Sequence, residues 1–325
     1  MPPLVVIAGP TASGKSALAL ALAERNDGVV INADSAQVYR DLRIVTARPS
    51  VQEEARAPHR LFGHVDAADP GYSAARWAAE ARTTIAQVSA AGQLPILVGG
   101  TGLYLRTLLD GIAPVPSIDP DVRARVRATP VAQAHAELAA LDPEAAAALH
   151  PNDTTRVHRA LEVVRSTGEP IARWRARREG GIGAAVRLVA TILLPPRAWL
   201  DARIAGRART IVEQGQAEVA ALLARPDLPA DAPIRRAIGV PELTGLVSGE
   251  ADEEATVAAL TLATRQYAKR QFTWFRRQPP PGWVRHDGTC ATEPIDQIET
   301  MLRQYPVDAQ PSSAYLAAPQ QGQST

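Results

Sequence analysis

The residues best suited to chemistry lie near the start of this 325-residue chain, in the octet Gly9-Pro10-Thr11-Ala12-Ser13-Gly14-Lys15-Ser16. The spacing Gly-x-x-x-x-Gly-Lys-Ser is typical of a loop whose backbone N–H groups surround a phosphate, with the lysine on the phosphate oxygens and the hydroxyl on a metal ion. Only two of the 35 Lys and Arg residues are lysines, and one stands here. A compact ammonium suits a tight loop better than a planar guanidinium does. The octet therefore predicts a bound polyphosphate.

Asp34 and Thr101 are further candidates, because each follows a short apolar run typical of a buried strand. A carboxylate beside a phosphate loop can hold magnesium or act as a general base, but Asp34 can equally cap the next helix. Thr101 can hydrogen-bond a phosphate oxygen or an incoming amino group, since the preceding Gly99-Gly100 pair lets the backbone approach a ligand. The alternative is that Thr101 only forms a turn, and the spacing leaves both choices open.

The charged residues around the octet differ from those of an NTP-hydrolysing P-loop protein. Such proteins usually hold magnesium with a second acid at the end of a strand, whereas the third apolar run here ends in Gly99-Gly100-Thr101. Arg203 and Arg207 lie four residues apart on a predicted helix and therefore share one face. They could bind a diphosphate if that face lines the site, although an exposed pair would be ordinary surface charge.

These side chains can converge only if the elements that carry them form a parallel sheet. Within residues 1–100, three apolar runs alternate with two helical patterns, an order typical of a parallel sheet with helices on both faces. Ligands bind such sheets at the carboxyl ends of the strands, where Lys15, Asp34 and Thr101 would meet. We therefore predict an α/β fold with a P-loop core, a parallel sheet flanked by helices, and an all-α insertion.

The pattern changes after residue 111, where helical segments rich in Ala and Arg follow without a convincing strand. Strand character returns at 186–194, and helical patterns cover 197–223 and 253–277. We predict a discontinuous catalytic core at 1–111 and 184–290, an all-α insertion at 112–183, and a disordered tail at 305–325, which has too few apolar residues to pack.

Composition limits the class of protein. The net charge is +1, so the overall charge argues neither for nor against nucleic acid. The single cysteine, Cys290, excludes a disulfide framework and a Cys-based zinc site, while His59 and His64 have no metal-ligand partners at a useful spacing. We find no apolar stretch long enough for a membrane span and no signal peptide before the first strand. We expect a soluble, cytoplasmic protein.

Two segments concentrate positive charge. Residues 155–178 carry seven arginines against two acids, and residues 264–277 carry five cations and no acid. On a helix, Arg265, Lys269 and Arg276 would lie opposite an apolar stripe, whose aromatic residues we expect in the core. A solvated helix face usually offsets such charge with acids three or four residues away. The unpaired basic stripe therefore favours a polyanion, with phosphate groups as its partners.

Several short blocks in order along the chain resemble the tRNA dimethylallyltransferase (tRNA isopentenyltransferase) family, whose members prenylate an adenosine beside the anticodon. The match extends over most of the chain, from Leu4 to Arg277. The blocks are GPTASGKS (9–16), DSAQVY (34–39), TARP (46–49), PHRL (58–61), LVGGTGLY (97–104), HPND (150–153), TRVHRALEV (155–163) and KRQFTWFR (269–276). The family usually has Gly in place of Val45, and Tyr with a basic residue in place of Val240-Pro241.

The resemblance implies that the P-loop holds dimethylallyl diphosphate rather than ATP, with Mg2+ as cofactor. The dimethylallyl group would pass to N6 of the adenosine 3′-adjacent to the anticodon in tRNAs, giving N6-isopentenyladenosine and diphosphate. Asp34 would be the base for the N6 amino group, Thr101 would bind at the reacting centre, and Lys15 would stabilise the leaving group. Ser16 would ligate magnesium, and the octet with Arg203 and Arg207 would bind diphosphate.

The resemblance also implies partners, namely the tRNA anticodon stem-loop and dimethylallyl diphosphate; we expect a monomer with no membrane contact. The implied tRNA-contacting residues are Asp34, Ser35, Ala36, Gln37, Thr101, Arg123, Thr155, Arg156, Val157, His158, Arg159, Arg236, Gly239, Lys269, Arg270, Gln271, Trp274 and Arg276. Three alternatives stay open: an adenylate isopentenyltransferase acting on free nucleotide, a P-loop small-molecule kinase, and a non-catalytic RNA-binding protein. The basic segments at 155–178 and 264–277 argue against the first, which would have little use for them.

Overall fold

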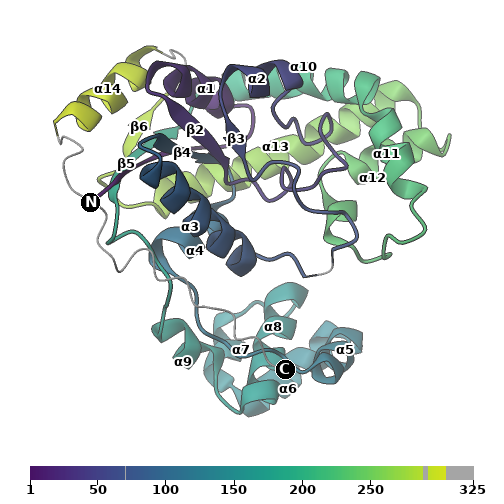
Figure 1. Ribbon diagram of the computed structural model, residues 1–325. Helices are drawn as coiled ribbons and strands as arrows, with labels where there is room; N and C mark the ends of the chain where they lie inside the picture. Colours follow the sequence, from purple (N-terminus) through teal and green to yellow (C-terminus); the bar gives the residue numbers. More distant parts are fainter. Residues whose placement is uncertain (70, 288–291, 305–325) are drawn as a thin grey trace, which may run out of the picture. The chain divides into compact units, whose positions relative to one another are not determined.

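The computed structural model describes residues 1–69, 71–287 and 292–304, so Cys290 and the predicted tail at 305–325 lie outside the described part of the chain. The chain separates into two compact units, Met1–Arg106 with Gly183–Thr325, and Thr107–Ile182. The first contains a parallel sheet with helices on both sides, and the described elements of the second are helical (Figure 1).

Six parallel strands form the sheet of the first unit, in the order β3-β2-β4-β1-β5-β6. Strand β1 pairs with β4 on one side and β5 on the other, so that Val5 lies between Ile96 and Val189. The strand bounds are β1 Pro3–Ala8, β2 Gly28–Asn32, β3 His59–Arg60, β4 Leu94–Gly99, β5 Arg187–Leu193 and β6 Val284–His286. The predicted α/β class is confirmed.

Apolar residues on both faces of the central strands explain why helices cover the sheet on both sides. Strands β2 and β4 are buried along their whole length, and successive side chains of a strand point to opposite faces. Val5, Val30 and Ile96 pack on one face with helices α1 (Lys15–Arg25) and α14 (Thr292–Arg303). Helix α3 (Ala74–Ala90) lies against β2 and β4 on the other face (Figure 1).

The remaining helices of the first unit agree in part with the sequence prediction. The helix predicted at 253–277 is confirmed, whereas the one predicted at 197–223 is interrupted at Gly215, where α10 ends and α11 begins. Strands β3 and β6 were not predicted, because two and three residues are too few to show a pattern. The bounds are α2 Val51–Arg56, α4 Gly102–Asp110, α10 Arg197–Gln214, α11 Gln216–Leu223, a 3-10 helix Pro233–Arg236, α12 Val240–Val247 and α13 Glu253–Arg277.

The second unit has a core of its own. Leu138 and Leu161 are fully buried there, together with Val157. Glu162 is also buried, at 4% exposed, and its carboxylate pairs with Arg127 at 3.2 Å and Arg159 at 3.6 Å. The helices are α5 Pro120–Ala128, α6 Val131–Leu141, α7 Pro143–Ala148, α8 Thr154–Thr167 and α9 Ile171–Ala176.

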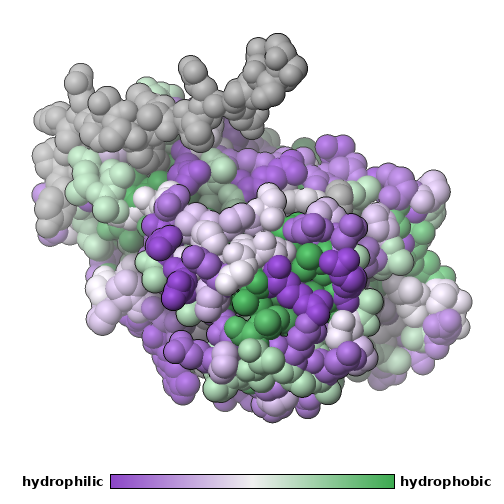
Figure 2. Space-filling view, turned by 90° about the horizontal axis from the view of Figure 1, so that it is seen from below, coloured by the Kyte–Doolittle hydropathy of each residue, from purple (hydrophilic) through white to green (hydrophobic). Residues whose placement is uncertain are grey.

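The surface carries mainly polar side chains. Figure 2 shows one face on which hydrophilic residues surround a smaller hydrophobic area. Among the described helices, none combines the length and the hydropathy that a membrane span requires.

Helix α13 packs closely on the turn that follows β4. A Cβ atom at Gly100 would lie 2.3 Å from the amide nitrogen of Gln271, and one at Gly102 would lie 2.5 Å from the Trp274 ring. At Gly99 a Cβ atom would lie 2.2 Å from the backbone oxygen of Ala33. Protein packing therefore requires glycine at both positions, and our prediction that the pair also lets the backbone approach a ligand stays a prediction.

Replacing Gly102 with alanine should destabilise the fold by about 1–3 kcal/mol, because the new methyl group overlaps the Trp274 ring. Gly206 in α10 is a matched control, since no described atom outside its own helix turn lies within 4 Å of its Cβ position. Gly206→Ala should raise the free energy of unfolding by up to about 1 kcal/mol through helix propensity. Urea unfolding followed by circular dichroism measures both, and equal changes would contradict the tight contact at Gly102.

Candidate active site

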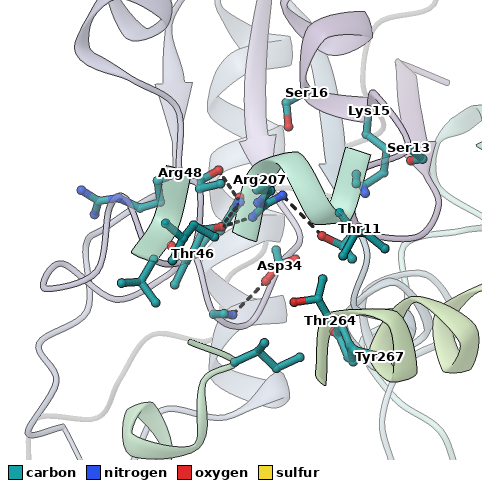
Figure 3. A pocket seen from close by; sticks show the side chains of 18 of the residues that line it. Thr11, Ser13, Lys15, Ser16, Asp34, Thr46, Arg48, Arg207, Thr264 and Tyr267 are labelled. Atoms are coloured by element: carbon teal, nitrogen blue, oxygen red, sulfur yellow. Dashed lines mark hydrogen bonds between the residues drawn. The ribbon is translucent and has the colours of Figure 1, made fainter. Parts of the chain in front are cut away.

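A pocket of about 590 Å³ lies in the first unit, where β1, β2 and β4 end. It is lined by the P-loop, the turn 34–37, the loop 45–48 and helices α10 and α13, so segments far apart in the sequence meet there. Figure 3 shows the labelled side chains of Lys15, Asp34, Arg207 and Tyr267 around this space. The structure thus brings the P-loop and Asp34 together at the strand ends, as the sequence predicted, and it adds the Arg203–Arg207 pair, whose position the sequence left open.

Lys15 begins helix α1 and is half-buried. Nζ donates a hydrogen bond to the Pro10 backbone oxygen at 2.6 Å. Burial lowers the pKa of Lys15 to about 8; the Asp34 carboxylate acts in the opposite direction, and Arg207 lowers it further. A cation whose charge is disfavoured by burial gains most when an anion is placed beside it. The P-loop is therefore electrostatically prepared for a phosphate.

Helix α10 places both of its candidate arginines on the P-loop. Arg203 Nε donates to the Ala12 backbone oxygen at 3.0 Å, and its guanidinium stacks over the Trp199 ring at 4.6 Å. Arg207 reaches Thr11 Oγ1 with Nη1 at 3.4 Å and the Thr46 backbone oxygen with Nη2 at 3.1 Å. Burial lowers the pKa of Arg207 while Asp34 raises it. The pair thus belongs to the pocket and is not ordinary surface charge.

Asp34 is held in a defined orientation, but it does not cap a helix. Its carboxylate Oδ1 accepts from the Ala36 N–H at 2.9 Å, which closes a turn. Its own N–H donates to Asn32 Oδ1 at 2.8 Å, while Asn32 Nδ2 donates to the backbone oxygens of Asp34 and Leu61. The Asn32 side chain is fully buried. The helix-cap alternative is wrong, and Asn32 is a positioning residue that the sequence did not reveal.

Thr101 lies directly behind this turn. Its Oγ1 accepts from the Ser35 N–H at 3.0 Å, and it also forms a hydrogen bond with the Tyr267 hydroxyl. Burial raises the pKa of Tyr267, and the Asp34 charge raises it further, so the phenol stays protonated. The sequence analysis expected the aromatic residues of this helix, including Tyr267, in the core. The structure instead places Tyr267 in the lining of the active-site pocket, together with Arg270 three residues later.

Gln271 was expected on the RNA-contacting surface, and the structure corrects this. The side chain is 6% exposed. Its Oε1 accepts from the Thr11 N–H at 2.8 Å, and its Nε2 donates to the Gly100 backbone oxygen at 2.9 Å. Both ends of the amide therefore serve to tie the P-loop to the end of β4.

Other expected RNA contacts are corrected as well. Val157 is fully buried in the second unit, so its side chain offers no surface. Trp274 packs on Gly102 and makes an edge contact with Phe275 at 4.9 Å, but it is only half-buried, so its contact with RNA stays a prediction. Arg265 is paired with Asp201 of α10 at 3.2 Å, so the stripe on α13 is not unpaired at that position.

The basic surface of α8 is also partly neutralised. Arg156 pairs with Asp153 at 3.5 Å, and Arg165 pairs with Glu137. His158 Nε2 lies 3.0 Å from the Thr129 backbone oxygen. Arg123 and His158 are half-buried, and Thr155, Arg156 and Arg159 are exposed.

Four residues of the first unit keep positions compatible with the RNA prediction. Arg236 and Arg270 line the pocket, and the Arg270 guanidinium lies over the Tyr267 ring at 5.7 Å. Lys269 and Arg276 are exposed on α13.

Loop 43–48 is fixed by a residue that sequence analysis missed. The Glu218 carboxylate of α11 accepts from the N–H groups of Arg43 at 3.0 Å, Ile44 at 2.9 Å and Val45 at 3.1 Å. Val45 is buried, and a Cβ atom at Gly239 would lie 2.6 Å from Val45 Cγ1. The first departure from the family pattern, Val45, therefore lies against Gly239, the residue directly before the second departure. Gly239 itself is buried, so it presents no surface.

The donor set fits a magnesium ion shared with a phosphate ligand. Ser16 lines the pocket at the start of α1, and the buried Ser13 Oγ has no hydrogen-bond partner among the described residues. The described residues contain no cluster of three His, Cys, Asp or Glu side chains that could hold a metal by themselves. Magnesium commonly takes one or two protein ligands and completes its shell with phosphate oxygens and water.

Comparison with known proteins identifies close relatives. The model of the family described as IPP transferase matches residues 37–278. A tRNA dimethylallyltransferase of Sphingopyxis alaskensis is 58% identical over 303 residues, covering 93% of this chain and 98% of the relative. The enzyme of the same name from Zymomonas mobilis subsp. mobilis is 49% identical over 301 residues, covering 92% and 96%.

Solved structures of proteins with the same kind of name resemble this chain as well. The full-length tRNA isopentenylpyrophosphate transferase of Bacillus halodurans superposes with a TM-score of 0.67 at 34% identity, covering 94% of this chain and 96% of that chain. A eukaryotic dimethylallyltransferase acting on tRNA gives a TM-score of 0.81 at 26% identity, covering 96% and 82%.

The affinity for inorganic diphosphate should fall as the pH rises through about 8, because Lys15 then loses its charge in the free protein. Diphosphate itself becomes more negative over this range, so its own titration acts in the opposite direction. Calorimetry between about pH 6.5 and 9.5 measures the affinity, and binding near pH 8 should take up protons because the anion raises the lysine pKa. The Lys15→Met variant should bind diphosphate weakly, and its affinity should not decline as the pH rises through about 8. The same pH dependence of diphosphate affinity in the wild type and in Lys15→Met would contradict the assignment.

Proposed function

Because the chain belongs to the IPP transferase family, we propose that it transfers a dimethylallyl group from dimethylallyl diphosphate to N6 of the adenosine 3′-adjacent to the anticodon of tRNA. The observation that carries this proposal is one pocket with two chemically distinct parts. Lys15, Arg203 and Arg207 gather on the P-loop, and Asp34 stands across from them as a fixed carboxylate. This arrangement suits a reaction in which a diphosphate leaves and a proton is accepted.

The cations of the P-loop stabilise the leaving group. The N6 lone pair attacks C1 of the allylic donor, the C1–O bond breaks, and diphosphate departs with the bonding electron pair. Positive groups that are already in place when this charge develops lower the barrier, because they need no reorganisation. Arg207 is held by Thr11 and the Thr46 carbonyl, and Arg203 by the Ala12 carbonyl, so both guanidinium groups are oriented before the ligand arrives.

Asp34 accepts the proton that N6 loses. One of its oxygens is engaged by the Ala36 N–H, and the turn around it is fixed by Asn32. Tyr267, protonated and bonded to Thr101, offers a neutral polar group beside the reacting amino group. In this role Thr101 positions Ser35 and Tyr267 at the reacting centre and does not exchange a proton itself.

Magnesium is the proposed cofactor, held by Ser16 together with diphosphate oxygens. When bound, it neutralises charge on the diphosphate and helps it to leave. The protein residues around it contribute separately: the backbone of the P-loop binds the phosphate oxygens, and Lys15 supplies a further positive charge.

Recognition of tRNA is proposed for both units. In the first, Arg236, Lys269, Arg270 and Arg276 are placed to contact the phosphates or the target base. In the second, the segment predicted as an insertion at 112–183 carries Arg123 and the exposed residues Thr155, Arg156 and Arg159 for the stem-loop. The monomeric state and the cytoplasmic location stay predictions from the sequence.

The proposal is tested by mass spectrometry of an unmodified anticodon stem-loop RNA after incubation with the protein, Mg2+ and dimethylallyl diphosphate. We expect the adenosine 3′ to the anticodon to gain one dimethylallyl group. Prenylated AMP formed from free nucleotide, with unmodified RNA, would instead support an adenylate isopentenyltransferase. Phosphate transfer from ATP would support a kinase, and good RNA binding with no product would support a binding protein.

Asp34→Asn should lower kcat by about 10²–10⁴-fold, the usual contribution of a general base, because the amide cannot accept the N6 proton. The amide oxygen can still accept from Ala36, so RNA affinity should stay nearly unchanged. Single-turnover kinetics and RNA binding by fluorescence anisotropy measure the two effects. Asp231→Asn, on an exposed residue outside the pocket lining, is the control. Equal loss of turnover and RNA affinity in Asp34→Asn would contradict the role of Asp34 as base.

A further inference from the structure

A second pocket, of about 440 Å³, lies in the first unit beside the active-site pocket. The motif blocks at 46–49 and 58–61 contribute Arg48, Pro58, His59 and Arg60 to it, and the proposed reaction gives the side chains of these four residues no role. It is lined by Arg40, Arg43, Arg48, Glu54, Pro58, His59, Arg60, Phe62 and Gly63. Four arginines face one glutamate, so the lining carries a formal charge of about +3 when the histidine is neutral.

The guanidinium groups of this basic pocket are ordered by the protein. Arg43 donates to the Pro49 backbone oxygen at 2.7 Å and pairs with Glu54 at 3.2 Å. Arg48 donates from Nη1 to the Tyr39 backbone oxygen at 3.1 Å, and Arg60 donates to the His59 backbone oxygen at 3.1 Å. Backbone oxygens orient Arg48 and Arg60 without neutralising them, whereas Arg43 is paired with Glu54 and Arg40 lies 3.9 Å from Asp66, which is outside the lining. Only Glu54 supplies a negative charge within the lining.

Arg48 is the most constrained of the four. Its half-buried guanidinium makes no ion pair with a described residue, and its buried Nε has no acceptor among them. Burial lowers the pKa of Arg48 and the neighbouring Arg43 lowers it further, whereas the carboxylates of Glu54, Glu218 and Asp41 raise it. A desolvated cation next to a second cation is costly unless an anion binds there.

Gly63 makes this position of Arg48 possible. Its φ angle is +54°, and a Cβ atom there would lie 1.3 Å from Arg48 Nη1. The guanidinium therefore lies directly over the glycine backbone, and any side chain at 63 would displace it. The local backbone is built around the arginine.

We propose that this basic pocket binds one phosphate group, through Arg48 and Arg60 with Arg43 and Arg40 beside them. Guanidinium groups bind phosphate oxygens through paired N–H donors, which suits this ordered set. The site is separate from the P-loop but joined to it by loop 43–48. Thr46 of that loop is bonded to Arg207 in the active-site pocket, whereas Arg43 and Arg48 extend into the basic pocket.

The phosphate can come from the RNA backbone or from a free anion. RNA is favoured, because Arg48 lines both pockets and a nucleotide chain entering the active-site pocket has phosphates on either side of the target base. This assignment of the source rests on the proposed function; the phosphate chemistry of the pocket does not.

The experiment compares Arg60→Gln and Arg48→Gln with Arg209→Gln, an exposed arginine of α10 that lines neither pocket. In the first arm, affinity for the unmodified anticodon stem-loop is measured over a salt series. Loss of one phosphate contact should lower the slope of log K against log salt by about 0.7–0.9 in the two pocket variants and leave Arg209→Gln unchanged. In the second arm, the rise in melting temperature caused by inorganic phosphate is measured for the same proteins.

A smaller salt slope in Arg60→Gln and Arg48→Gln alone supports an RNA phosphate. Unchanged slopes, with the phosphate-induced rise in melting temperature reduced in both variants, support a free anion in the same pocket. Results equal to wild type in both arms overturn the proposal. Arg60 is exposed, so Arg60→Gln keeps the test decisive if Arg48→Gln does not fold. Prenyl transfer by the wild-type protein is assayed in parallel, so that absence of product marks failure of the proposed function and not of the basic pocket.

Discussion

The active-site pocket is governed by the burial of positive charge around a single turn. Lys15 and Arg207 are removed from solvent to the extent that their pKa values fall, and Asp34 is the acid that opposes the effect on both. Such an arrangement is stable only if the surrounding structure fixes each cation, because mutual repulsion would otherwise drive them apart. The carbonyls of Pro10, Ala12 and Thr46 serve this purpose, since each accepts a hydrogen bond from a cation. An anion bound in the pocket would offset the repulsion between these cations.

Helix α13 supplies the second constraint, because it connects the two chemical parts of the pocket. Gln271 holds Thr11 of the P-loop to the end of β4, and Tyr267, one turn earlier, is bonded to Thr101 beside the Asp34 turn. The absence of side chains at Gly100 and Gly102 allows the helix to come this close. A shift of α13 would therefore move the phosphate-binding loop and the proton-accepting turn at the same time.

The parts of this site that the sequence predicted are those encoded by neighbouring residues. The P-loop spacing, the buried strands and the long helix α13 each depend on a local pattern, and the positions of Lys15 and Asp34 follow from the parallel sheet. Gln271, Tyr267 and Glu218 could not be predicted in the same way, because their partners are distant in the chain, 260 residues away for Gln271 and Thr11. The same limit explains why Arg265 was expected to be unpaired: its partner Asp201 comes from another helix.

Loop 43–48 shows how one short segment can link two anion-binding surfaces. Its backbone N–H groups point to the Glu218 carboxylate, which fixes the loop without using any side chain of the loop itself. Its carbonyls at 46 and 47 accept from Gln37, and Arg207 also donates to the first of them. The side chains of the loop can therefore line different pockets. Val45 lines the active-site pocket, and Arg48 extends into the basic pocket. Since the loop is held by the half-buried Glu218 and by Arg207 of the active-site pocket, an anion bound at Arg48 would act on the same hydrogen-bond network that orients Arg207.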